Sequence, residues 1–93
     1  MIRHIVMWKV REGTEAQAEE FLTKLRGLYG VIPQLRACEV AKNVGADNYD
    51  AVLVSEFDSM EALAAYKTDP RHVAVSGLCK DIRVDRVAVD YEF

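Results

Sequence analysis

Two side chains in the second half of the sequence have the chemistry of an acid–base pair. Tyr66 and His72 lie close together in the segment AYKTDPRHV. An imidazole has an ordinary pKa of about 6.5, so it can accept and return a proton near neutral pH. A neighbouring tyrosine can hold the tautomer of that imidazole or donate a hydrogen bond to a developing enolate oxygen. We therefore take His72 and Tyr66 as the candidate catalytic pair.

The same side chains also have purely structural interpretations. A histidine in the first turn of a helix can pack between helix and sheet and bond a backbone carbonyl group, and Tyr66 can be a core aromatic. His4 and Trp8 share the apolar face of a predicted strand, which is typical of core or pocket-wall residues. We take these two as candidate ligand-binding residues, and the residues alone leave both interpretations open.

Several other chemistries lack the residues that they need. The two histidines, without HxxxH, HxH or clustered carboxylates, make a poor metal site. Cys38 and Cys79 form no CxxC pair and are expected to be free thiols. The sequence contains neither a glycine-rich phosphate loop nor a GxSxG motif. We therefore predict no metal, no cofactor and no nucleophilic catalysis.

Composition restricts the partners. The 93 residues include 12 basic and 15 acidic side chains, for a net charge of −3. This balance lacks the basic surplus that binds nucleic acid, and AVLVSEF lacks the exposed aromatics of an RNA-recognition strand. No apolar run approaches the roughly 18 residues of a membrane span, and the N-terminus does not resemble a signal peptide. We predict one cytoplasmic domain over residues 1–93.

The hydrophobic pattern predicts an α+β fold. The expected strands are 2–10, 35–44, 49–57 and 82–91, and the expected helices begin at Thr14, at Asp58 or Ser59, and after Asp69, the last covering about 70–80. The order βαββα(α)β is typical of a ferredoxin-like four-stranded antiparallel sheet with helices on one face.

The helix patterns predict which side chains face the core. Thr14 and Gln17 form a candidate capping box at the start of the first helix, which is expected to end at Gly30 and Pro33. The expected buried stripe of this helix is Ala18, Phe21, Leu22, Leu25, Leu28, Tyr29 and Ile32. In the second helix, Met60, Leu63 and Ala64 are expected to point inward beside Tyr66.

The first and third predicted strands are apolar on both faces. Helices of the same chain cover one face, and a chain of this length has nothing left to cover the other. A bare apolar face of several hundred Å² is unusual on a monomer. We therefore predict a homodimer that packs sheet face against sheet face as a dimeric α/β barrel.

Four segments, MIRHIVMWKVREGT, YDAVLVSEFDSMEALAAY, DPRHVAV and DRVAVDYEF, resemble the stress-responsive A/B barrel (Dabb) domain family. The resemblance extends from Ile2 to Phe93, and its most specific part is the tyrosine, proline and histidine of AYKTDPRHV. It implies a small dimeric α+β barrel with a ferredoxin-like protomer. Most members of this family have no assigned activity.

The family includes a plant polyketide cyclase that closes a linear polyketide by an intramolecular aldol condensation. Its tyrosine–histidine pair implies catalytic roles for Tyr66 and His72, and its first-strand pocket histidine matches His4. Ala51 stands where that cyclase has another pocket histidine.

We expect an uncharacterised homodimer that binds a small apolar ligand between sheet and helices. One alternative is a cyclase-like or related proton-transfer enzyme, and another is a purely structural, stress-linked dimeric module.

Overall fold

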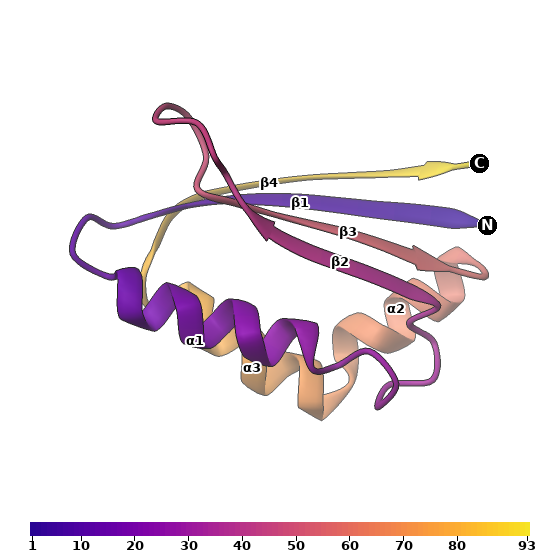
Figure 1. Cartoon of the computed structure of the whole chain (residues 1–93). Coiled ribbons are helices and arrows are strands. Elements are labelled where there is room, and N and C mark those ends of the chain that lie inside the picture. Colours follow the sequence, from indigo (N-terminus) through magenta and orange to yellow (C-terminus); the bar gives the residue numbers. More distant parts are fainter.

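The structure, a computed structural model, describes all residues from 1 to 93 (Figure 1). Its elements are β1 (Ile2–Val10), α1 (Glu15–Arg26), β2 (Ala37–Lys42), β3 (Ala51–Phe57), α2 (Met60–Thr68), α3 (Pro70–Lys80) and β4 (Arg83–Glu92). This is the predicted order, with the first strand and the third helix at the predicted positions. No helix has the length and the apolar character that crossing a membrane requires.

The four strands form one antiparallel sheet in the order β2-β3-β1-β4. All three helices lie on the same side of it (Figure 1). The predicted ferredoxin-like fold is therefore confirmed. The sheet of one chain is open rather than closed into a barrel, and β2 and β4 are its edges.

Side chains alternate along the central strands. On β1, Ile2, His4, Val6 and Trp8 are buried, whereas the residues between them are half-buried or exposed. The same alternation on β3 buries every second residue from Ala51 to Phe57. Phe21, Leu22 and Leu25 of α1 pack against this buried face, because their spacing places them on one stripe of the helix. The core thus lies between the sheet and the helices.

The first helix is shorter than predicted. It ends at Arg26, and the chain then turns through Gly30, whose φ of +85° is incompatible with a continued helix. Leu28 and Ile32 are still buried, but Tyr29 is 57% exposed, so its predicted place in the core was wrong. The predicted capping box was also wrong, because the Thr14 hydroxyl donates to the Arg11 carbonyl and accepts no hydrogen bond from a backbone N–H of the helix.

The second helix is capped by Ser59, whose Oγ accepts a hydrogen bond from the backbone N–H of Ala62. Leu63 and Tyr66 are its buried residues. Met60 and Ala64 are exposed, so their inward orientation was predicted wrongly. The narrow apolar stripe of this short helix faces the sheet through residues spaced by three.

The third helix begins at the predicted position. The Asp69 carboxylate accepts a hydrogen bond from the Arg71 N–H at 2.9 Å, and Pro70 occupies the first turn. Proline suits this position because its missing N–H has no helical partner there. This start places His72 in the first turn of α3. The two thiols are free, Cys38 half-buried and Cys79 buried.

The face of the sheet away from the helices is covered by nothing in the same chain (Figure 1). By strand register its centre is apolar, with Ile5, Met7, Val52, Val54, Val87 and Val89 on neighbouring strands. Its charges are partly paired, since the Arg3 guanidinium bonds Glu56 at 2.9 Å and the Tyr91 hydroxyl at 2.9 Å.

Candidate functional site

A row of polar residues crosses the sheet on its helix side. Cys38, Ser55, His4 and Asp90 are direct neighbours across β2, β3, β1 and β4. His4 and Ser55 are buried within a face that is otherwise apolar. Ser55 satisfies its hydroxyl by donating to the backbone carbonyl of His4 at 3.1 Å. The row therefore brings one titratable imidazole and one carboxylate into the layer between sheet and helices.

His4 is held by Asp90. The imidazole Nδ1 is bonded to the Asp90 carboxylate, which also lies 4.0 Å from the Lys67 ammonium group. Burial lowers the pKa of His4, and the nearby carboxylate offsets this effect only in part. A neutral His4 donates its Nδ1–H to Asp90, which leaves Nε2 as a free acceptor.

Tyr66 lies on α2 and is completely buried. Its ring packs on Phe57 with centroids 5.0 Å apart. The Tyr66 hydroxyl is buried and has no hydrogen-bond partner. Burial, and to a lesser degree the Cys38 thiol, raises the pKa of Tyr66 far above its ordinary value. Tyr66 is therefore a neutral hydrogen-bond donor without an acceptor.

His72 packs against Tyr66, with ring centroids 4.4 Å apart. Its Nδ1–H donates to the backbone carbonyl of Lys67 at 3.1 Å, which is also the bond that a structural histidine would make. Burial is the main cause that lowers the pKa of His72. The charge of Arg86, and that of His4 when His4 is protonated, lower it further. Both histidines are thus neutral at pH 7, with Nδ1 engaged and Nε2 free.

His4, Tyr66, His72 and Asp90 together form what we call the histidine cluster. The structure thus brings three of the four sequence-predicted site residues together. Asp90 was missed by the sequence analysis, because its proximity to His4 depends on the register of β1 and β4, which are distant in sequence. The one available signal was a carboxylate within an alternating apolar strand.

Trp8, the fourth candidate, lies elsewhere. It belongs to the same face of β1 as His4, but Val6, only 1% exposed, stands between them. Trp8 lines a cavity of about 750 Å³ at the opposite end of the sheet and packs edge-on against Phe21 at 5.1 Å. Ala51 lines the same cavity.

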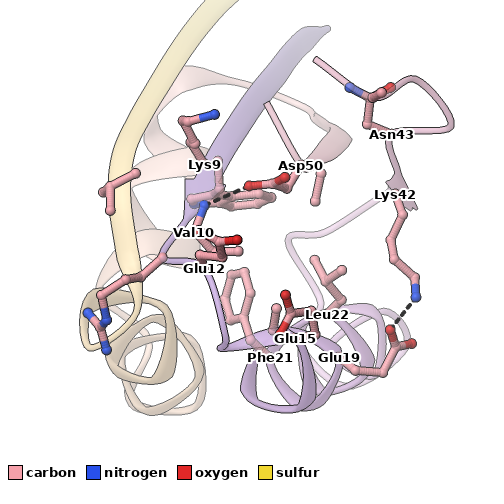
Figure 2. Close-up of a pocket in the computed structure, with 16 residues that line it drawn as sticks. Lys9, Val10, Glu12, Glu15, Glu19, Phe21, Leu22, Lys42, Asn43 and Asp50 are labelled. Carbon is pink, nitrogen blue, oxygen red and sulfur yellow. Dashed lines mark hydrogen bonds and ion pairs between the residues drawn. The ribbon is translucent and has the colours of Figure 1, made fainter. Parts of the chain in front are cut away.

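Figure 2 shows this second location, which we call the Trp8 cavity. Phe21 and Leu22 of α1 form its apolar side, and charged residues lie around its edge. Lys42 and Glu19 form an ion pair there that joins β2 to α1. The cavity has the apolar lining of a ligand pocket, but none of the residues of the histidine cluster lines it.

No group of three or more His, Cys, Asp or Glu side chains is arranged to hold a metal ion. The chemistry that the histidine cluster offers is proton transfer between a ligand and neutral imidazoles, together with hydrogen bonding from a neutral phenol.

The open four-stranded antiparallel sheet with three helices on one face places the chain in the class of ferredoxin-like α+β proteins. Within that class, the chain belongs to the stress responsive A/B barrel domain (Dabb) family, whose family model matches residues 2–93. The predicted family is therefore confirmed.

The relatives connect this chain with proteins of known and unknown activity. It is 34% identical over 98 residues to an uncharacterised protein of Streptomyces coelicolor, with both chains fully covered. It is 27% identical over 95 residues to olivetolic acid cyclase of Cannabis sativa, covering 97% of this chain and 94% of the cyclase. A similar solved structure is a dimeric protein of unknown function with a ferredoxin-like fold from Bacteroides fragilis. That structure has a TM-score of 0.92 and 30% identity, and the match covers 99% of this chain and 95% of that one.

Proposed function

We propose that this Dabb protein is a homodimer that binds a small, largely apolar ligand at the histidine cluster. The observation that carries the proposal is the buried Tyr66 hydroxyl without a partner. A buried polar group left unsatisfied costs about 1–3 kcal/mol. An oxygen atom of a ligand would supply the acceptor that Tyr66 lacks.

On the helix side of the sheet, β4 is partly exposed, which supports the access of a ligand to the histidine cluster. Ala88 and Asp90 pair with the buried residues Val6 and His4, and so face the helix side. Both are nevertheless exposed, because the helices do not extend over this edge strand. A ligand that lies along β4 would contact Ala88 with an apolar group and reach His72, which is half-buried.

The most concrete activity is proton transfer beside a carbonyl group. His72 Nε2 takes a proton from the carbon next to the carbonyl, the electron pair of the C–H bond forms a carbon–carbon double bond, and the carbonyl oxygen becomes an enolate. Tyr66 donates a hydrogen bond to that oxygen. The similarity to a cyclase supports this chemistry, as does the neutral state of both side chains.

Deuterium exchange tests this activity without knowledge of the substrate. The probe is 4-phenylbutan-2-one in D₂O, whose protons next to the carbonyl exchange when an enolate forms. We expect the wild-type protein to accelerate exchange, and His72→Gln and Tyr66→Phe to reduce that acceleration at least about tenfold. Tyr29→Phe is the control, because Tyr29 is exposed and outside the cluster. Equal exchange in all four proteins would reject the enzymatic function.

Two built-in reporters separate the possible binding places. The chain has only two histidines and one tryptophan. Their NMR and fluorescence signals therefore report on the histidine cluster and the Trp8 cavity respectively. We expect 4-phenylbutan-2-one to shift the signals of His4 and His72. A change confined to Trp8 fluorescence would move the ligand to the Trp8 cavity and contradict the proposal.

The second candidate is a structural dimeric module without an active site. It is favoured by the hydrogen bond from His72 to the Lys67 carbonyl, which ties α3 to the end of α2. On this account His72→Ala would lower the free energy of unfolding and affect neither exchange nor probe binding.

The homodimer is supported by the uncovered apolar face of the sheet and by the dimeric relative from Bacteroides fragilis. A second copy of this chain would bury that face against its own equivalent. The cytoplasmic location stays a prediction of the sequence.

A further inference from the structure

Arg86 lies on the same side of the sheet as the histidine cluster. It pairs with Trp8 across β1 and β4, two steps of alternation from the pair formed by His4 and Asp90. Because paired residues of antiparallel strands share a face, Arg86 and Asp90 both belong to the helix side of β4. Ala88 lies between them on that side.

The Arg86 guanidinium has no partner in the chain. Arg3, Arg36 and Arg71 each bind a carboxylate. The backbone N–H of Arg86 is bonded to Asp85, but its side chain makes neither a hydrogen bond nor an ion pair. An exposed guanidinium of this kind carries five unused N–H donors.

The charge of Arg86 nevertheless reaches the cluster. After the larger effect of burial, it contributes to lowering the pKa of both His4 and His72. Arg83 carries the same charge on the same strand but is not among the main causes that lower the pKa of either histidine. Among the unpaired cations of β4, Arg86 is therefore the one whose charge acts most clearly on both histidines of the cluster.

We propose that Arg86 binds a carboxylate of the ligand, so that the site selects apolar molecules with an acidic group at one end. The proposal rests on the ligand site at the histidine cluster. The planar guanidinium fork matches a carboxylate with two parallel hydrogen bonds. The Cα atoms of Arg86 and Asp90 are separated by four residues of strand, about 13 Å at the usual rise. A ligand of several carbon atoms spans that distance, with its apolar part over Ala88.

The test compares two probes that differ only in charge. These are 4-phenylbutanoate and its neutral amide, 4-phenylbutanamide, and binding is measured from the NMR shifts of the two histidines. We expect Arg86→Leu to weaken binding of the carboxylate about tenfold or more and to change binding of the amide less than about twofold. Arg83→Leu removes the same charge from β4 and is expected to leave both affinities unchanged.

The outcomes separate this inference from the function on which it rests. If both probes shift the histidine signals and Arg86→Leu affects them equally, or affects neither, the role of Arg86 is rejected and the ligand site stands. An equal loss in Arg83→Leu would mean that only the overall charge attracts the carboxylate, which also rejects it. If neither probe shifts the histidines of the wild-type protein, both the ligand site and the role of Arg86 are rejected.

Discussion

The buried hydroxyl of Tyr66 is the feature of single residues that most needs an explanation. Its ring is well packed, between Phe57 at 5.0 Å and His72 at 4.4 Å. Packing alone would be served equally well by phenylalanine, which carries no polar atom. The proposed ligand would give the Tyr66 hydroxyl the hydrogen-bond acceptor that it lacks in the single chain.

Replacing Tyr66 by phenylalanine tests that explanation. We expect Tyr66→Phe to leave the free energy of unfolding unchanged or to raise it by up to about 1 kcal/mol, because the variant buries no unsatisfied hydroxyl. Urea denaturation measures the change, with Tyr29→Phe as the exposed control. A loss of about 1 kcal/mol or more would show that the hydroxyl already stabilises the folded chain.

The two histidines predict how stability depends on pH. The pKa of each is lowered in the folded protein, mainly by burial. The unfolded chain, with an ordinary histidine pKa of about 6.5, therefore binds more protons than the folded one below that pH. The free energy of unfolding therefore has its full value above about pH 6.5. It decreases as the pH falls through the lower pKa values of the histidines in the folded protein.

The surroundings of the histidines contain opposing charges. Asp90 raises the pKa of His4, and Asp69 raises the pKa of His72, so each carboxylate opposes the effect of burial. Lys67 lowers the pKa of His4, and Arg86 lowers the pKa of both histidines. NMR titration of the two imidazoles, with urea denaturation at pH 7.5 and pH 5.5, measures both effects. A histidine that titrates above about 6.5 would contradict the neutral cluster.

The sequence predicted most members of the histidine cluster, but it did not predict all the residues that lie around it. Tyr66 and His72 are close in the chain, and strand alternation placed His4 on the helix side. Trp8 lies four residues from His4 on one strand, about 13 Å at the usual rise, so their separation follows from the predicted strand. Only the packing of Val6 between them required the structure. Asp90 and Arg86 depend on a register between the two ends of the chain.

At the scale of elements, α2 and α3 determine where the candidate pair lies. Ser59 starts α2 and Asp69 starts α3, so two caps fix Tyr66 and His72 relative to each other. The sequence predicted both starts because each has a side-chain signal. It did not predict the early end of α1, since the apolar spacing continues through Leu28 and Ile32 although the helix does not.

The cap of α2 gives a prediction for this scale. We expect Ser59→Ala to lower the free energy of unfolding by about 1 kcal/mol, because the Ala62 N–H loses its acceptor. Ser59→Asp keeps an acceptor at the same position and is expected to retain most of the stability. Equal losses in the two variants, measured by urea denaturation, would contradict the capping role.

At the scale of the whole molecule, the uncovered sheet face is the main feature. Its central positions are aliphatic on three strands, and its exposed members include Met7, Val87 and Val89. A second copy of this chain is the simplest partner for this face, because it requires no other protein. The sequence predicted this face because the first and third strands are apolar on both sides. The closed barrel that it also predicted requires the second copy.

A charge placed on that face should separate the dimer. We expect Val89→Lys to raise the dimer dissociation constant by a factor of about 100 or more, because two buried ammonium groups cost several kcal/mol. Val73→Lys adds the same charge to an exposed position of α3, away from the sheet face, and is the control. Light scattering over a range of concentrations measures both. Dissociation by the two variants alike, or by neither, would contradict this interface.

Native mass spectrometry of freshly purified protein shows in one measurement whether the chain is a dimer and whether it holds a ligand at the histidine cluster. We expect a species near 21 kDa, twice the 10.5 kDa chain, with a reproducible small-molecule adduct. We also expect a variant carrying both Tyr66→Phe and His72→Gln to lose the adduct and to remain dimeric. A monomer, a wild-type dimer without any adduct, or an adduct that persists in the double variant would contradict the proposed ligand-binding dimer.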